Sequence, residues 1–487
     1  MKPCEVRVAI TGFQGLDDRD CGAAVARALR AGWNGPISID ALGCDPMMTG
    51  AWMPGIADRL HLIPESTAGD HAMLTRLLEL HAQWPFEVLI PCTSEDVSMI
   101  SRISGALTDA GIRVLLPKPE YLVNVAPPRL PDFCFEHATA APGSIFLTDF
   151  EDLPDQADRL GYPLLVKDPV SGEKTVYSQQ EALSEAQRLQ RLRGEGVVLQ
   201  QKVAGDEYAV ALVMDAGGTC VGMSAMRKLA MNEAGKEECG SAVDDPVINQ
   251  LALDIAAEMK WRGPLVLDFV RPPGVRKPWL KGLHCHFPAW VMLSHWAGNN
   301  LPVKLLEILL EQSNAQSEFD HAGSMLIHGV TEAAVPAASI AELQRKGSIQ
   351  HPGHAAKLKA VEDEPVDEVT VAVTGISTFD LINPGLGAAR ALKGARGIRK
   401  VIGLNYGNFD SGSFQAEICD TAYRLPITQD DSVFMQRLRE IHQAAPFDVL
   451  LPCLDGELPR FIALRKEIEA LGVSLLLPEQ EAFDRRA

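Results

Sequence analysis

The chain has 487 residues, enough for about three compact domains at roughly 100–200 residues each. Its 64 Asp and Glu outnumber its 45 Lys and Arg, so the formal net charge is −19. This balance argues against a nucleic-acid-binding protein, which usually carries a basic surface. The sequence has no run of 18 or more apolar residues and no apolar stretch of the signal-peptide kind at its N-terminus. We therefore expect a cytoplasmic protein that binds neither membrane nor nucleic acid.

The first 126 residues predict a small α/β domain. Short apolar runs, typical of buried strands, alternate with longer amphipathic stretches, and the expected strands are 8–11, 37–42, 60–63, 88–90 and 114–116. Such a pattern favours a doubly wound parallel sheet covered on both faces. The first turn, residues 11–16, reads TGFQGL, which is not the GxGxxG pattern of a dinucleotide site.

The middle block, residues 127–335, predicts a mixed α+β domain. Strands are expected at 164–167, 197–200, 208–214, 220–224, 265–270 and 279–283, and helices at 182–192, 246–259 and 301–310. A smaller subdomain covers about residues 127–200. The following segment, 336–368, is rich in Ala, Pro and charged residues, which predicts a linker.

Residues 369–487 repeat the first domain. VAITG at 8–12 returns as VAVTG at 371–375, and PFEVLIPC at 85–92 returns as PFDVLLPC at 446–453. The offset stays between 361 and 363, so the chain contains an internal duplication. We expect the second copy to be another small α/β domain.

The middle block resembles the ATP-grasp superfamily. A strand ends in Lys167, and about thirty residues later the chain reads VLQQKVAGDEY at 198–208. With the duplicated α/β domains, the order of elements is similar to the carbamoyl phosphate synthetase large subunit, cut short after a second pre-ATP-grasp domain. The resemblance implies a pre-ATP-grasp domain, an ATP-grasp domain and a second pre-ATP-grasp-like domain. It also implies ATP as cofactor, with Mg²⁺.

The resemblance assigns roles to individual residues. Lys167 matches the lysine that binds phosphate, and Glu207 matches the carboxylate that binds ribose. The hinge beside the adenine would be formed by Gln201, Lys202 and Val203, and a basic residue at the start of the small subdomain would be Arg129. The resemblance also places Arg227 and Lys228 near the phosphates or an acyl phosphate, although a charged strand edge explains this pair as well.

The metal-binding end departs from the family pattern. Asp268 matches one Mg²⁺-binding carboxylate and His284 falls where the family has asparagine, but Gly282 replaces a glutamate and His286 an arginine. Magnesium prefers oxygen ligands, which imidazole does not supply. The loop 168–175 is also poor in glycine. Alternatively, the two histidines bind a softer metal together with Asp268, or they form only a hydrogen-bonded polar patch.

Two functions follow from the resemblance. The first is a ligase that activates a small-molecule carboxylate as an acyl phosphate for an amine or a thiol. The second is a catalytically degenerate ATP-grasp subunit that binds nucleotide or acts as a scaffold. Because the sequence stops where a duplicated enzyme begins its second ATP-grasp domain, we expect a second ATP-grasp subunit or a homo-oligomer. Motifs of other enzymes, such as GxSxG, HExxH and the Walker motif, do not occur.

Overall fold

The computed structural model divides the chain into two compact units. The first comprises residues 1–326 and 332–357, and the second comprises residues 327–331 and 358–487. Within them the structure describes residues 5–13, 21–123, 129–168, 172–193, 196–232, 235–312, 323–329, 335–351, 368–377 and 383–478, together with residues 480, 483 and 485. The expected boundary at 126/127 lies outside the described residues.

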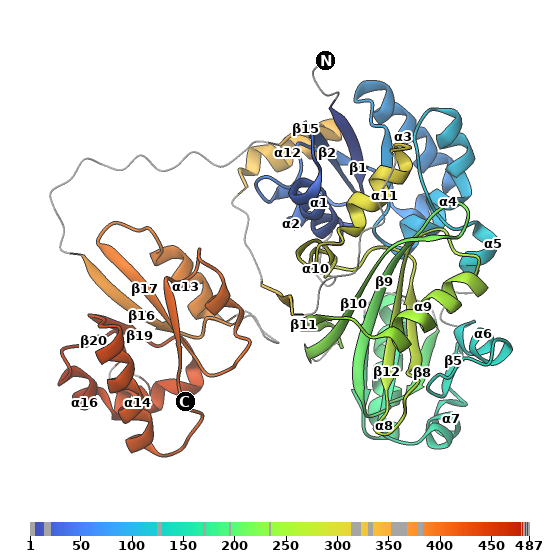
Figure 1. The fold of residues 1–487 in the computed structure, drawn as a ribbon. Helices are drawn as coiled ribbons and strands as arrows, with labels where there is room; N and C mark the ends of the chain where they lie inside the picture. Colours follow the sequence, from blue (N-terminus) through green and yellow to red (C-terminus); the bar gives the residue numbers. More distant parts are fainter. Residues whose placement is uncertain are drawn as a thin grey trace. The chain divides into compact units, whose positions relative to one another are not determined.

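The first unit opens with a parallel sheet, as the sequence predicts. Its strands β1 (Val6–Ile10), β2 (Ile37–Gly43), β3 (Arg59–Leu62) and β4 (Val88–Ile90) lie in the order β3-β2-β1-β4. Helices α1 (Cys21–Gly32) and α2 (Thr49–Trp52) pack on one face, and α3 (Asp70–Gln83) and α4 (Ser94–Asp109) pack on the other (Figure 1). Side chains alternate between these two cores along β1, so both faces of the sheet are buried.

Two sequence expectations for this sheet are wrong. Residues 114–116 form no strand, and only an isolated bridge joins Arg113 to Val88. On the opposite edge, part of the expected linker folds as helix α12 (Ala337–Lys346) and strand β15 (Ser348–Gln350), which pairs antiparallel with β3. Leu343 is fully buried in α12, so this helix is anchored by its apolar side and does not connect two domains.

The middle block forms two antiparallel sheets. The smaller contains β5 (Ser144–Leu147), β6 (Leu164–Asp168), β7 (Gly172–Val176) and β8 (Val197–Gln201) in the order β5-β8-β6-β7. The larger contains β9 (Asp206–Met214), β10 (Cys220–Met231), β11 (Glu237–Val243), β12 (Gly263–Arg271), β13 (Trp279–His284) and β14 (Met325–Ile327) in the order β13-β12-β9-β10-β11-β14.

The helices of this block confirm the predicted α+β pattern. They are α6 (Leu130–Glu136), α7 (Leu153–Leu160), α8 (Gln179–Arg193), α9 (Pro246–Glu258), α10 (Met292–Trp296) and α11 (Leu301–Leu309), and the short helix α5 (Pro119–Leu122) precedes the block. The fully buried Leu301 and Leu306 of α11 share one core with Val8 and Ile10 of the first sheet. The first α/β domain and the middle block are therefore packed together in one unit.

Four strands of the second unit repeat the strand order of the first sheet. Strands β16 (Val369–Thr374), β17 (Ile398–Asn405), β18 (Thr421–Arg424), β19 (Val449–Leu451) and β20 (Ser474–Leu475) are all parallel, in the order β18-β17-β16-β19-β20. The order β18-β17-β16-β19 repeats the order β3-β2-β1-β4. Its helices are α13 (Pro384–Leu392), α14 (Asp431–Ala444), α15 (Leu458–Ala463) and α16 (Arg465–Glu469).

The repeat also extends to single interactions. The backbone N–H of Cys92 donates to Thr11 Oγ1 at 3.1 Å, and that of Cys453 donates to Thr374 Oγ1 at 2.9 Å. The first turns of both units carry a glycine with positive φ, Gly12 and Gly375. Two copies that agree in strand order, turn conformation and hydrogen bonding support the duplication expected from the sequence.

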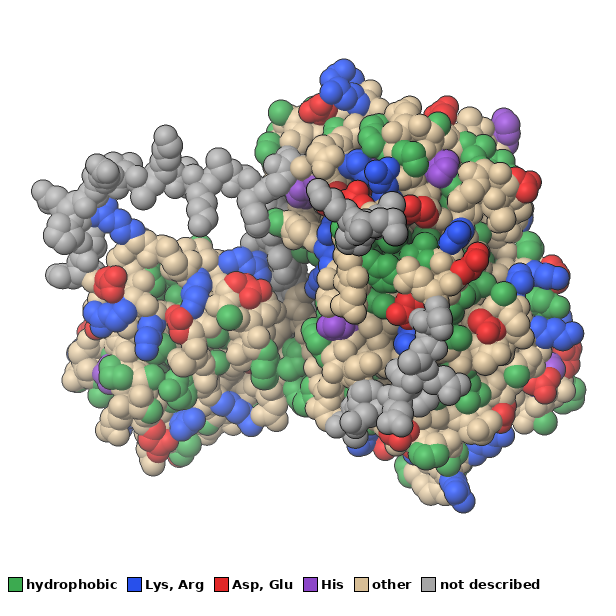
Figure 2. Space-filling view, turned by 45° about the horizontal axis from the view of Figure 1, so that its top comes forward, with side chains coloured by type: hydrophobic (Ala, Val, Ile, Leu, Met, Phe, Trp, Pro, Cys, Tyr) green, Lys and Arg blue, Asp and Glu red, His purple; other side chains and the backbone are tan. Residues whose placement is uncertain are grey.

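The surface shows no continuous charged face on the side seen in Figure 2, where acidic and basic side chains are interspersed on each unit. Among the described residues, no helix is both long enough and apolar enough to span a bilayer.

Candidate functional site

A cavity of about 480 Å³ lies between the two antiparallel sheets of the first unit. Strands from both sheets contribute to its wall: Leu165, Glu173 and Gln200 come from the smaller sheet, and Glu207 and Lys281 come from the larger. Its volume falls within the range of pockets that bind small molecules and cofactors. This cavity is therefore the candidate functional site.

The segment from Gln201 to Asp206 connects the two sheets and lines the cavity. Gln201, Lys202 and Val203, which the sequence predicts as a hinge, all contribute to the wall. The N–H of Gln201 donates to the carbonyl of Gly143 at 2.8 Å, and Lys202 Nζ donates to Thr175 Oγ1 at 2.8 Å. These contacts fix the start of the segment beside the smaller sheet.

Gly205 sets the path of this segment. A Cβ atom on Gly205 would lie 2.3 Å from the carbonyl oxygen of Arg271, closer than any real contact. The hinge therefore passes directly against the backbone at the end of β12, and a glycine is needed for this close approach.

Four charged side chains form a chain of ion pairs along the cavity. Glu173 binds Lys167 through Oε2 at 2.9 Å and Lys281 through Oε1 at 2.8 Å, and Lys281 also binds Glu207 Oε2 at 2.9 Å. The exposed fractions of these side chains lie between 9% and 19%. The predicted phosphate-binding lysine and the predicted ribose-binding carboxylate are thus linked through two residues that the sequence analysis did not identify.

The pKa shifts show how strongly these groups depend on one another. Burial raises the pKa of Glu173, but the attraction of Lys167 and Lys281 outweighs it and lowers the pKa to about 2. Burial lowers the pKa of Lys281, whereas Glu173 and Glu207 together raise it above its usual range. Burial also lowers the pKa of Lys167, and Glu173 only partly compensates. Glu173 is therefore ionised and holds two lysines.

A second group of charges surrounds Asp268 on β12. Lys228 Nζ lies 2.8 Å from Asp268 Oδ1 and 3.9 Å from Glu237 Oε2, and His284 Nε2 lies 3.1 Å from Asp268 Oδ2. Burial acts to raise the pKa of Asp268, but Lys228 and the hydrogen bond with His284 lower it well below its usual range. Burial acts to lower the pKa of Lys228, whereas Asp268 and Glu237 raise it. Both oxygens of this carboxylate thus have partners.

These residues do not fit a magnesium ion. Gly282 lies directly opposite Asp268 in the strand pair, so the neighbouring position supplies no second carboxylate. Lys228 occupies one oxygen of Asp268, and a lysine ammonium has no lone pair to offer a metal. Among the residues that the structure describes, no three His, Cys, Asp or Glu side chains come close enough to share a metal ion. His284, His286 and Asp268, the alternative site for a softer metal, do not form such a group among the described residues either.

The remaining predicted residues lie apart from the cavity wall. Arg129 pairs with Asp132 at 3.0 Å on the surface, and Arg227 pairs with Asp206 at 2.8 Å, about half exposed. Lys228, next to Arg227 on β10, points the other way and is buried beside Asp268. Of the predicted basic pair, Arg227 and Lys228, only Lys228 belongs to the group of charges around Asp268.

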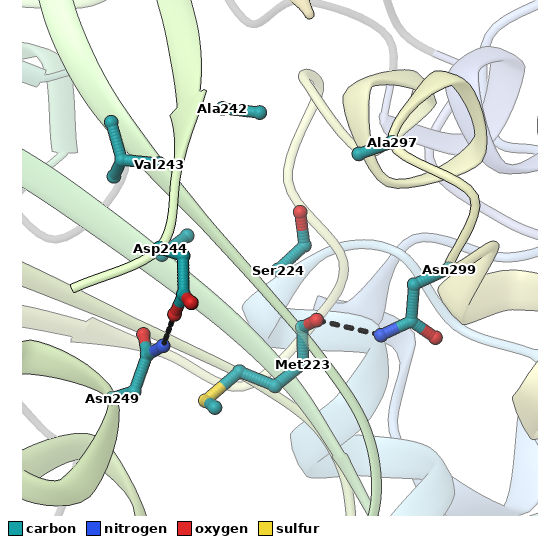
Figure 3. A pocket seen from close by; sticks show the side chains of 9 residues that line it. Met223, Ser224, Ala242, Val243, Asp244, Asn249, Ala297 and Asn299 are labelled. Atoms are coloured by element: carbon teal, nitrogen blue, oxygen red, sulfur yellow. Dashed lines mark hydrogen bonds between the residues drawn. The ribbon is translucent and has the colours of Figure 1, made fainter. Parts of the chain in front are cut away.

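A second cavity is too small for a ligand. It lies between β10, β11 and the residues before α11, and its volume of about 30 Å³ suits one water molecule (Figure 3). Asn299 Nδ2 donates to the carbonyl of Met223 at 2.7 Å, and Asn249 Nδ2 donates to Asp244 Oδ1 at 2.9 Å. These side chains hold the surrounding elements together.

No family model matches the chain, and no curated protein is similar to it in sequence. Solved structures are similar in fold. The biotin carboxylase–beta-gamma-ATP complex from Campylobacter jejuni has a TM-score of 0.50 at 11% identity, over 66% of this chain and 74% of that one.

Two further structures have lower scores. The biotin carboxylase domain dimer of 2-oxoglutarate carboxylase from Hydrogenobacter thermophilus, in complex with MgADP, ADP and bicarbonate, has a TM-score of 0.49 at 14% identity, over 66% of this chain and 73% of that one. D-alanine–D-alanine ligase from Bacillus anthracis has a TM-score of 0.45 at 16% identity, over 63% and 97%. At 11% identity the likeness to the Campylobacter jejuni structure shows the fold alone, and this agrees with the ATP-grasp fold expected from the sequence. The carbamoyl phosphate synthetase-like layout stays a prediction.

Proposed function

We propose that the cavity between the two sheets of the first unit binds an adenine nucleotide. The observation that carries this proposal is the meeting of the predicted hinge, Gln201 to Val203, with Glu207 in one cavity of about 480 Å³. Leu165, Val203 and Val270 offer apolar walls to a base, and Glu207 offers oxygen acceptors to hydroxyl groups. Lys167 does not line the cavity itself, but it forms an ion pair with Glu173, which does.

The charged network favours binding over ligation as the function. In an ATP-dependent ligase a carboxylate attacks the terminal phosphate, and metal ions neutralise the charge that develops. Here the one carboxylate at the expected metal position, Asp268, is held by Lys228 and His284. We therefore favour the second hypothesis, a nucleotide-binding ATP-grasp subunit, over a carboxylate–amine or carboxylate–thiol ligase. The partner chain expected from the sequence stays part of this proposal.

Isothermal titration calorimetry tests nucleotide binding. ATP, ADP and adenosine are titrated into the whole protein with and without Mg²⁺, and the same is done with Lys167→Ala and with Lys346→Ala. Lys346 is a half-exposed lysine of the same unit that pairs with Glu342 away from the cavity. We expect Lys167→Ala to lower the affinity for ATP and ADP relative to the affinity for adenosine. Lys346→Ala should leave these affinities unchanged. An absence of binding for all three ligands would overturn the proposal.

Release of ADP separates the two hypotheses. The protein is incubated with ATP, Mg²⁺ and mixtures of carboxylic acids with amines or thiols. We expect no ADP above the background of a Lys167→Ala control. Release that depends on one acid together with one amine or thiol would establish the ligase instead.

A further inference from the structure

Glu173 lies in the wall of the cavity between two lysine ammonium groups. Each of its two carboxylate oxygens binds one ammonium group, Lys167 at 2.9 Å and Lys281 at 2.8 Å. Two lysines on either side of an anion form the arrangement by which lysines bind phosphate. In this protein the anion is a side chain of the chain itself.

The ion pairs of Glu173 leave no surplus of positive charge on the two lysines that it binds. Lys167 and Lys281 carry two positive charges, and Glu173 and Glu207 carry two negative charges in the same chain of ion pairs. Lys202, which also lines the cavity, donates to Thr175 and takes no part in these pairs. An incoming polyphosphate thus has to displace Glu173 to reach Lys167 and Lys281.

The position of Glu173 is built into the fold. It stands opposite Lys167 in the register of β6 and β7, so the two side chains start from neighbouring points of one sheet. Gly235, in the turn between β10 and β11, lies against the same side chain, because a Cβ atom there would be 2.3 Å from Glu173 Cγ. Gly235 also has a φ of 72°, a conformation that favours glycine. A bulkier residue at this position would push Glu173 off the lysines.

We propose that Glu173 is a specificity-determining residue that acts as a built-in anion and makes the cavity prefer adenosine over adenosine polyphosphates. This inference rests on the proposed function, since it assigns the preference of the same cavity. The base and ribose of the ligand fill the cavity, and each added phosphate competes with Glu173.

Binding to Glu173→Gln tests this inference. The amide keeps the shape of the side chain and removes its charge, so Lys167 and Lys281 become available to phosphate. Adenosine, AMP and ADP are titrated calorimetrically into the whole protein with EDTA present. Wild type is compared with Glu173→Gln and with Glu79→Gln, whose glutamate is half exposed and pairs with Arg76 away from the cavity.

We expect wild type to bind adenosine at least as tightly as ADP. Glu173→Gln should bind ADP at least tenfold more tightly than wild type, with adenosine within twofold, and Glu79→Gln should behave as wild type. An unchanged ratio of ADP to adenosine affinity in Glu173→Gln would overturn the inference, as would tighter binding of ADP than of adenosine by wild type. If adenosine and the nucleotides all fail to bind to every variant, the proposed function fails instead.

A second variant covers the case in which Glu173→Gln does not fold. Glu173→Asp keeps the charge on a shorter side chain that cannot bridge both lysines at the observed distances. It should tighten ADP binding by a smaller factor, about threefold, without changing adenosine binding. A ratio equal to that of wild type would again contradict the inference.

Discussion

Lys281 should contribute strongly to the stability of the first unit. We consider Lys281→Met, because methionine keeps an unbranched apolar side chain of similar length and removes only the ammonium group. The lysine is 9% exposed and binds both Glu173 and Glu207. Its removal takes from Glu207 the lysine that pairs with it, whereas Glu173 keeps Lys167.

The expected loss of stability follows from these contacts. Breaking a buried ion pair by removing one partner costs about 3–5 kcal/mol, because the other charge stays buried without compensation. Here one of the two carboxylates keeps a partner, and both are 15% exposed, which places the expected loss near the lower end. We expect the free energy of unfolding of the first unit to fall by about 3 kcal/mol.

Tryptophan fluorescence measures this loss in one unit alone. All seven tryptophans of the sequence precede residue 327, so unfolding followed through them reports on the first unit. Urea is the suitable denaturant because it is uncharged and leaves ion pairs unscreened. The matched control is Lys346→Met, which removes an exposed helix pair with Glu342 and should cost less than about 1 kcal/mol.

Two outcomes decide this prediction. Adding Glu207→Gln to Lys281→Met should restore at least about 1 kcal/mol, because it removes the unpaired charge. If the free energy of unfolding lost in Lys281→Met is within about 1 kcal/mol of that lost in Lys346→Met, the prediction is refuted. The ion pairs seen around the cavity would then contribute little to folding.

Three further predictions concern the first unit. Because the pKa of Glu173 falls to about 2 in the folded protein, its stabilising effect is complete above about pH 4.5 and is lost as the pH falls towards 2. Urea unfolding at several pH values should show wild type losing up to about 3 kcal/mol more than Glu173→Gln between pH 5 and pH 2, and parallel curves would contradict this. Gly263→Ala should cost about 2–4 kcal/mol in urea unfolding, since its φ is 80° and its Cβ would lie 2.3 Å from the carbonyl oxygen of Leu115; a neutral effect would mean that this backbone contact relaxes freely. Ser348→Ala should cost about 1–3 kcal/mol, because it removes the 2.8 Å partner of the buried His61 Nδ1, and a loss no greater than that of an exposed serine would contradict it.

The sequence predicts six of the ten described strands of the middle block, because the signal of each is local; the predicted strands are β6, β8, β9, β10, β12 and β13. The expected strand 197–200 is observed as Val197–Gln201, and the expected helix 246–259 as Pro246–Glu258. Apolar runs bounded by turn residues carry this information without reference to the rest of the chain. Strand β15 could not be predicted in this way, because it has only three residues and pairs with β3, which lies almost 290 positions earlier.

The chain of ion pairs along the cavity could be predicted only in part. The ATP-grasp resemblance points to Lys167 and Glu207, but it does not point to Glu173 and Lys281, because their pairing depends on how two sheets face each other. Glu173 and Lys281 are 108 residues apart and on different sheets. A glutamate six residues after Lys167 on the returning strand was the one available signal, and it has meaning only once the register of β6 and β7 is known.

The pairing of β15 with β3 gives the two copies different folding histories. The first sheet receives its edge strand only after residue 350 has been synthesised, so a nascent chain carries the open edge of β3 through the folding of the whole middle block. Contacts this distant in sequence close slowly. The second copy forms its five strands within residues 369–475 and needs no such return. The C-terminal copy should therefore reach its native sheet sooner after its synthesis than the N-terminal one, although the ribosome produces it last.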